Sequence, residues 1–147
     1  TIMKDLLYLK DEQIKEFIQL LFDAYRETCA DPKEVLSKNY LGPAHLRSLN
    51  LIERHPGISL GELMFKLKVT KQSLNRVLKD LIKLEILMFK KGDKDTRIKH
   101  IFLTNKGEKI FNEIFDIQKK RIYNALLNSN SQEVLNFEKV LKKIINE

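Results

Sequence analysis

The chain has 147 residues, of which 43% are hydrophobic and 32% charged, and its formal net charge is +7. This length allows one domain, or two small lobes that share a core, and the apolar fraction excludes wholesale disorder. The single cysteine, Cys29, excludes a disulfide framework and a multi-cysteine metal site. We therefore expect a reducing, cytoplasmic compartment. In agreement with this, the sequence shows no signal peptide and no apolar run of the ~20 residues that are needed to span a membrane.

The positive charge is concentrated in the middle of the chain. Residues 55–103 hold 11 basic and 5 acidic residues, whereas residues 1–54 have a net charge of −1 and residues 104–147 of +2. A phosphate-binding surface concentrates charge in this way, whereas charge that serves solubility is spread out. The distribution indicates a polyanionic partner, with chance clustering as the alternative.

The first third of the chain is predicted to be helical. Residues 11–30 carry apolar side chains at the spacing of one helical stripe, and the Asp31-Pro32 pair ends this helix. The stripe consists of Ile14, Phe17, Ile18, Leu21, Phe22 and Tyr25. A short apolar arm precedes it, with Ile2, Leu6, Leu7 and Leu9. A polar connection follows, for which we expect Leu36 and Tyr40 to be anchors.

A second helix is predicted to begin at Gly42-Pro43 and to stop at His55-Pro56-Gly57. Its apolar face consists of Leu46, Leu49 and Ile52. The next helix is short, and the spacing of Ser59 and Glu62 predicts a capping box at its start. A tight turn at Lys68-Val69 follows, and Thr70 is the predicted N-cap of a helix over residues 71–84.

The helix over residues 71–84 has one apolar and one polar face. Its apolar face consists of Leu74, Val77, Leu78, Leu81 and Leu84, and its polar face of Lys71, Gln72, Ser73, Asn75, Arg76 and Lys79. Two short amphipathic helices around a tight turn are typical of a helix-turn-helix. Arg pairs with guanine, and Asn or Gln with adenine, in the major groove. The polar face therefore indicates a DNA-reading helix, with an ordinary solvated face as the alternative.

A basic β-hairpin is predicted to follow the reading helix. Residues 86–91 and 98–103 have strand length and composition, and Gly92-Asp93-Lys94-Asp95 lies between them as a turn. Its basic residues are Lys90, Lys91, Lys94, Arg97 and Lys99. A basic hairpin at this place predicts a wing that contacts phosphates or a narrow minor groove.

These segments resemble the MarR-type winged helix-turn-helix regulators. Residues 95–107 follow the wing pattern D-x-R-x-K-x-V-x-L-T-x-x-G, with Ile101 in place of Val, and residues 58–87 resemble the family's helix-turn-helix. The order of elements agrees over roughly the whole chain. Lys68 and Glu85 stand where the family often has Gly, so left-handed turns formed by non-glycine residues are expected there.

The last third is predicted to be a dimerisation region. Thr104 is the predicted cap of a helix from Asn105 to Leu127, and Ser131 of a final helix. Their apolar residues are Ile110, Phe111, Ile114, Phe115, Ile117, Ile122, Leu126, Val134, Leu135, Phe137, Val140, Leu141, Ile144 and Ile145. The exposed reading helix and wing cannot cover so much apolar surface. A second copy of the chain is the favoured cover, with a monomeric helical core as the alternative.

The resemblance to the MarR family implies further roles. It implies intertwined terminal helices in a homodimer, and Arg97 in the minor groove with Asp95 holding it. It also implies a small aromatic or acidic effector between the two lobes, for which Tyr25, Arg26, His45 and Arg47 are candidates, although structural roles compete for these residues. Cys29 is a candidate oxidant sensor by the same resemblance, with an inert thiol as the favoured alternative.

The predicted fold is mainly α with a small β-hairpin wing. It comprises an N-terminal helix that belongs to the dimerisation region (residues 1–40), a winged helix-turn-helix DNA-binding domain (residues 41–103) and C-terminal dimerisation helices (residues 104–147). The predicted function is a sequence-specific, homodimeric regulator that binds a pseudo-palindromic operator in double-stranded DNA. The alternatives are a non-specific architectural DNA-binding protein and a protein–protein interaction module. The sequence shows no catalytic grouping, cofactor motif or metal-ligand spacing, so we expect neither an enzyme nor a cofactor. It shows no membrane segment, so we expect no membrane partner.

Overall fold

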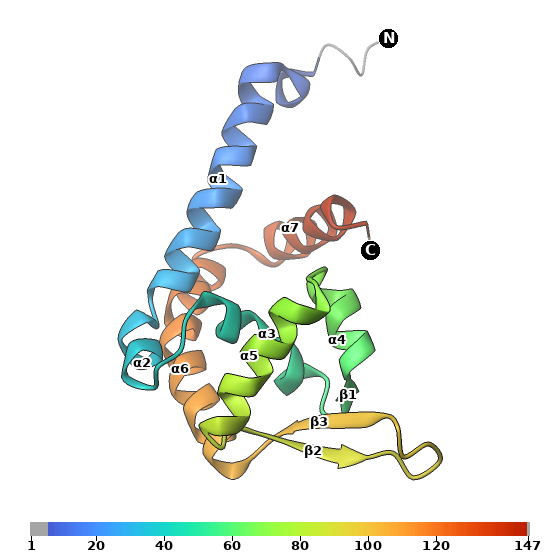
Figure 1. Cartoon of the computed structure of the whole chain (residues 1–147). Helices are drawn as coiled ribbons and strands as arrows, with labels where there is room; N and C mark the ends of the chain where they lie inside the picture. Colours follow the sequence, from blue (N-terminus) through green and yellow to red (C-terminus); the bar gives the residue numbers. More distant parts are fainter. Residues whose placement is uncertain (1–5, 147) are drawn as a thin grey trace.

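The computed structural model describes residues 6–146, which are mainly helical with a small sheet at one end of the molecule (Figure 1). A 3₁₀ helix spans Leu7–Leu9, and the α-helices are α1 (Asp11–Ala30), α2 (Lys33–Lys38), α3 (Pro43–Arg54), α4 (Leu60–Leu67), α5 (Lys71–Lys83), α6 (Asn105–Leu127) and α7 (Ser131–Ile144). The strands are β1 (Ile58–Ser59), β2 (Leu87–Lys91) and β3 (Lys99–Leu103). The architecture confirms the predicted fold class. No helix among residues 6–146 has the length and apolarity that crossing a membrane requires.

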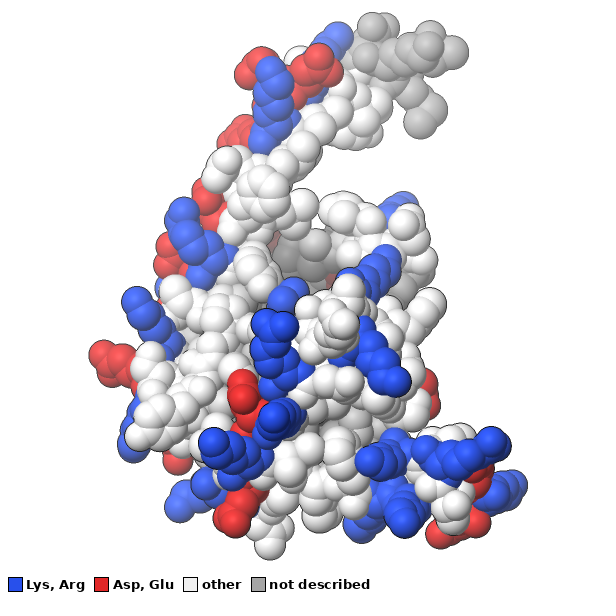
Figure 2. All heavy atoms as spheres, viewed as in Figure 1, with Lys and Arg blue, Asp and Glu red and all other residues white. Residues whose placement is uncertain are grey.

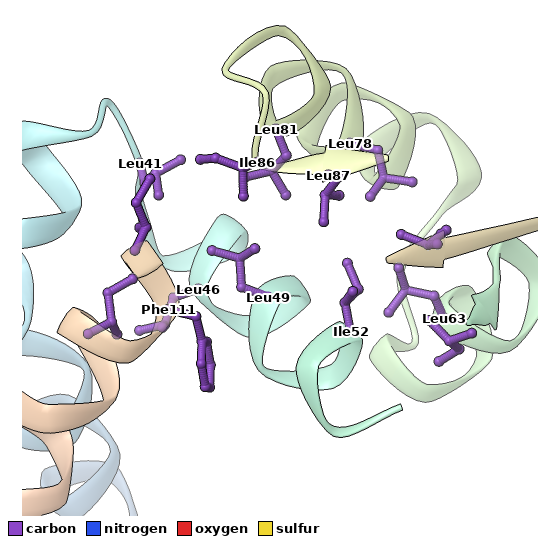
Figure 3. Close-up of a cluster of buried hydrophobic side chains, with 14 of the residues drawn as sticks. Leu41, Leu46, Leu49, Ile52, Leu63, Leu78, Leu81, Ile86, Leu87 and Phe111 are labelled. Carbon is purple, nitrogen blue, oxygen red and sulfur yellow. The ribbon is translucent and has the colours of Figure 1, made fainter. Parts of the chain in front are cut away.

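The hydrophobic core lies between α3, α4, α5, the sheet and the first half of α6 (Figure 3). Leu46, Leu49 and Ile52 form the buried face of α3, as their spacing predicts. The predicted inward face of α5 supplies three fully buried leucines to the same core: Leu74, Leu78 and Leu81. Burial of one such side chain contributes about 1.5–3 kcal/mol. The core therefore fixes which face of α5 remains in solvent.

The sheet has three antiparallel strands in the order β1-β3-β2. Strands β2 and β3 form the predicted hairpin, with Leu87 opposite Leu103 at its base and Lys91 opposite Lys99 near its tip. The two-residue strand β1 was not predicted, because a strand this short has no recognisable alternation. It pairs Ile58 with Ile101 and thereby fastens the hairpin to the start of α4.

The helices α1 and α7 bury none of their side chains among the described residues. In Figure 1, α1 projects away from the body of the molecule, and only its C-terminal part lies beside α6. The second half of α6 is also exposed, including Phe115, Ile122 and Leu126. The apolar stripes of the terminal helices are therefore not covered within one chain.

Several local predictions are corrected by the structure. Tyr40 is not an anchor, because its left-handed backbone (φ 61°) leaves its side chain 82% exposed, whereas Leu36 is buried. The polar connection that contains Leu36 includes the short helix α2. Asn130, not Ser131, caps α7, with its side-chain oxygen 2.8 Å from the Glu133 backbone nitrogen. The expected residue Ile2 lies outside the described residues.

Candidate nucleic-acid interface

The two helices of the helix-turn-helix begin with the predicted caps. The Ser59 hydroxyl accepts from the backbone N–H of Glu62 at 3.2 Å, and it donates to the Glu62 carboxylate at 3.0 Å. The Glu62 carboxylate therefore contacts the hydroxyl, not the backbone N–H that a capping box predicts. Lys68 forms the turn between the helices in the left-handed conformation (φ 53°, ψ 46°), which confirms the expectation for this non-glycine position.

The N-terminus of α5 orders one of the candidate reading residues. Thr70 caps α5 by accepting from the Ser73 backbone N–H at 3.1 Å. The Thr70 hydroxyl also donates to the Ser73 hydroxyl oxygen at 3.0 Å. The Ser73 hydroxyl therefore keeps its own proton for another acceptor, such as a base edge or a phosphate.

The polar face of α5 is fully presented to solvent. Its six predicted residues are all exposed: Lys71, Gln72, Ser73, Asn75, Arg76 and Lys79. The buried leucines on the opposite face hold this arrangement, since a rotation of α5 would bring its polar face into the core. The structure therefore brings the predicted reading residues together on one free helical surface.

The hairpin carries cations at positions that weaken it as an isolated sheet. Lys91 and Lys99 are direct cross-strand partners, and like charges directly opposite each other destabilise a ladder. Two lysines lie over aromatic rings: the Lys99 ammonium is 5.4 Å from the Phe89 centroid and that of Lys90 4.9 Å from Phe102. Figure 2 shows Lys and Arg side chains gathered over the end of this hairpin. The arrangement suits an anion that approaches the wing.

Asp95 and Arg97 form a two-point pair at the wing tip. The Arg97 side chain donates to both carboxylate oxygens of Asp95 at 3.1 Å, and the Arg97 backbone N–H donates at 3.0 Å. The guanidinium of Arg97, followed by its backbone N–H, holds the pKa of Asp95 below its ordinary value. The Arg97 side chain is nevertheless 89% exposed. Asp95 therefore orients a cation that remains free on its outer side.

A groove of about 680 Å³ separates α5 from the wing. Its floor is apolar and includes Leu78, Ile82 and Phe89, while Lys79 and Lys99 contribute cations from its opposite sides. A protein that places a helix in the major groove and a wing in the adjacent minor groove must straddle the phosphate backbone between them. The groove lies where this strand would pass.

One contact on α5 was not predicted. The His45 Nε2 lies 3.0 Å from the Asp80 carboxylate, and His45 Nδ1 accepts from the Gly42 backbone N–H at 3.0 Å. Because Nδ1 is an acceptor, the ring proton lies on Nε2 and is donated to Asp80. His45 thus links α3 to the one acidic residue of α5. The two residues are 35 positions apart, so no local pattern could reveal the pair.

The candidate effector residues do not line one cavity. Tyr25 and Arg26 line a space of about 390 Å³ between α1, α2 and α3, together with Cys29. Partial desolvation and a hydrogen bond with Cys29 raise the pKa of the Tyr25 phenol. Arg47 opposes this shift through its charge but lines a separate cavity. Within residues 6–146, no three metal-ligating side chains come together.

Comparisons with known proteins agree with this geometry. Residues 41–98 match the MarR family. The chain is 39% identical to the HTH-type transcriptional regulator PetP of Rhodobacter capsulatus over 140 residues. The aligned region covers 95% of this chain and 84% of that protein.

Solved structures of similar fold include two proteins in complex with ligands. MarR of Staphylococcus aureus, in complex with salicylate and kanamycin, has a TM-score of 0.73 at 22% identity, covering 93% of this chain and 95% of that chain. FabT of Streptococcus pneumoniae, in complex with DNA, has a TM-score of 0.72 at 16% identity, covering 93% and 96%. At these identities the structural matches establish the fold.

Proposed function

The chain belongs to the MarR family of transcriptional regulators, and we propose that it binds a two-fold symmetric DNA operator as a homodimer. In this proposal α5 enters the major groove and the β2–β3 wing reaches the adjacent minor groove. The homologues are transcriptional regulators and not enzymes, and the exposed face of α5 and the wing offers the hydrogen-bond donors and cations that DNA binding requires.

The proposal rests on one observation: the exposed face of α5 and the basic wing lie on the two sides of one groove. The free face of α5 offers Gln72, Asn75 and Arg76, whose side chains suit base edges. On the other side of the groove, the wing places Lys91 directly opposite Lys99. Such an unfavourable pair is stabilised when a phosphate neutralises it. Base-reading donors on one wall and phosphate-binding cations on the other are what duplex DNA requires.

The homodimer follows from the uncovered helices. Three residues of the α1 stripe are 47–65% exposed, namely Phe17, Ile18 and Phe22. Helix α7 exposes Phe137, Val140 and Ile144 in the same way. A self-complementary apolar surface on helices that flank the DNA-binding part favours a symmetric dimer. In this proposal, residues 1–40 and 104–147 are assigned to the dimerisation region and residues 41–103 to the DNA-binding domain.

Two further assignments rest on the same proposal. A regulator of transcription works on the chromosome, so a cytoplasmic location follows from its partner. The cavity lined by Tyr25 and Arg26 would take a small organic effector, and the Arg26 guanidinium would favour an acidic one. The salicylate complex of the S. aureus relative supports an effector of this class.

The test is a selection from a random duplex pool, followed by titration of the enriched sequence. We expect one enriched, two-fold symmetric motif for the wild-type protein. The variant Arg76→Lys keeps the net charge but loses the planar fork that recognises guanine, so it should enrich a different base at one step of each half-site. DNA binding without enrichment would indicate a non-specific architectural protein. No binding to any duplex would favour a protein–protein interaction module.

A further inference from the structure

The C-terminus of α5 ends in a left-handed turn that directs three consecutive carbonyl groups toward α6. Glu85 adopts φ 62°, and the backbone N–H of Ile86 bonds to the Leu81 carbonyl at 2.9 Å, while that of Glu85 bonds to Ile82 at 2.9 Å. This pattern is a Schellman motif, with a glutamate where glycine is usual. The motif ends the reading helix at a fixed place, immediately before the wing begins at Leu87.

The first turn of α6 donates to all three of these carbonyl groups. The Lys106 ammonium donates to the Leu84 carbonyl at 2.8 Å, and the Thr104 hydroxyl donates to that of Glu85 at 2.6 Å. The Thr104 backbone N–H donates to the Ile86 carbonyl at 3.0 Å. The Thr104 hydroxyl oxygen also caps α6 by accepting from Gly107 N–H at 3.0 Å. The end of the reading helix and the start of α6 therefore share one set of hydrogen bonds.

Gly107 makes the contact between these segments unusually close. A Cβ atom at this position would lie 2.1 Å from the Ile86 carbonyl oxygen and 3.1 Å from its carbon. The clashing atoms belong to the backbone, so a side chain at residue 107 requires the two elements to separate. Gly107 is needed here for the close approach, since its own backbone is helical.

The junction acts on the reading residues through the length of α5. At ~1.5 Å per residue, the first turn of α5 lies roughly 18 Å from Glu85, so a tilt of about 10° at the junction displaces it by about 3 Å. That displacement is close to the ~3.4 Å between successive base pairs. A small change at this junction therefore moves a reading helix by one base step relative to α6.

We propose that Thr104, Lys106 and Gly107 are positioning residues that fix the spacing of the two half-sites which the dimer accepts. This inference rests on the proposed function, because α6 relates the two reading helices only in a dimer bound to DNA. The three residues lie outside the free face of α5 and the wing tip. They hold the reading helix rigidly on the helix that carries the dimer surface.

The test uses the selected operator and duplexes in which the spacer between its half-sites is shortened or lengthened by one base pair. Wild-type protein should prefer one spacer. Gly107→Ala should shift the preferred spacer or remove the preference. Lys106→Met, which keeps the aliphatic stem but loses one hydrogen bond, should reduce the preference by about fivefold. Lys109→Met is the matched control, because the exposed Lys109 side chain forms no hydrogen bond within residues 6–146, and it should keep the wild-type profile.

The base preference within a half-site should be unchanged in the variants, which separates positioning from reading. If both variants keep the wild-type spacer profile, or lose affinity equally for every spacer and for an isolated half-site, the inference is wrong. If Gly107→Ala does not fold, Lys106→Met decides alone. Absence of DNA binding by wild-type protein would instead refute the proposed function.

Discussion

The salt dependence of DNA binding follows from the number of free cations on the proposed interface. The proposed DNA-contacting face of α5 and the wing expose eight basic side chains in each protomer: Lys71, Arg76, Lys79, Lys90, Lys91, Lys94, Arg97 and Lys99. Neutralising a phosphate releases its condensed counterion, and this release weakens as bulk salt rises. The affinity for long duplex DNA should therefore fall steeply with ionic strength.

The size of the effect can be worked out from the structure. If about half of these side chains contact phosphates, a dimer neutralises roughly six to eight, and the slope of log affinity against log salt is about −5 to −7. Between ~50 and ~200 mM salt this corresponds to a loss of about 10³- to 10⁴-fold. Lys94→Gln removes one cation from the wing of each protomer, so the slope should become shallower by nearly two.

Fluorescence anisotropy with a labelled duplex, at four or more salt concentrations, measures the slope. Lys15→Gln is the control, because Lys15 pairs with Glu12 on α1, at the far end of the molecule from the wing (Figure 1). It should leave the slope unchanged. A flat response of the wild-type protein would remove the nucleic-acid hypothesis, and an equal change in both variants would contradict the placement of the interface.

Three further predictions concern reading, assembly and pH. Arg76→Ala should change the preferred base at one step, at a cost of about 1–3 kcal/mol on the selected site, whereas Arg97→Ala should weaken binding to all operator variants and reduce any flanking A·T preference, as competition titrations would show. Phe17→Glu places a charge in the α1 stripe and should yield a 17.3 kDa monomer in sedimentation, where the wild-type protein has twice that mass. The hydrogen bonds from Arg121 lower the pKa of Asp31, so the stability they contribute is present above the ordinary pKa of aspartate and is lost as the pH falls below it. Chemical denaturation should therefore show Asp31→Asn less stable than wild type near pH ~6, with the difference shrinking as the pH falls through the lowered pKa of Asp31.

The elements with a regular pattern could be predicted from the sequence. Helices α1, α3 and α6 have the predicted bounds, because Pro, Gly and N-cap residues mark their ends as clearly as apolar spacing marks their faces. The resemblance to the MarR family, rather than a local pattern, predicts the left-handed turns at Lys68 and Glu85, and both residues have positive φ. Helix bounds that are specified by a short stretch of sequence can therefore be predicted from that stretch alone.

The features that depend on distant residues could not be predicted in this way. The pair between His45 and Asp80 joins two helices, and the bond from Lys106 to the Leu84 carbonyl spans 22 positions. A lysine near a helix N-terminus is indistinguishable in the sequence from an ordinary surface residue. Its charge is even unfavourable there, because the N-terminus is the positive end of the helix dipole. Only the folded chain shows that it bonds to a carbonyl group at the end of another helix. The exposure of Tyr40 likewise depends on a left-handed turn that the neighbouring residues in the sequence do not predict.

The energetics of base reading explain why so much of the chain is given to dimerisation. Gln72, Asn75 and Arg76 allow about three bidentate contacts, each worth about 1–3 kcal/mol of discrimination, so one reading helix supplies roughly 6 kcal/mol. A genome offers about 10⁶ or more competing sites, and a preference of that size requires about 8 kcal/mol. One reading helix falls short, whereas two at a fixed spacing reach about 12 kcal/mol. The additional discrimination is gained only if both helices meet their half-sites in register. Under the proposed function, a rigid joint between α5 and α6 is therefore as necessary to the specificity as the side chains that are proposed to touch the bases.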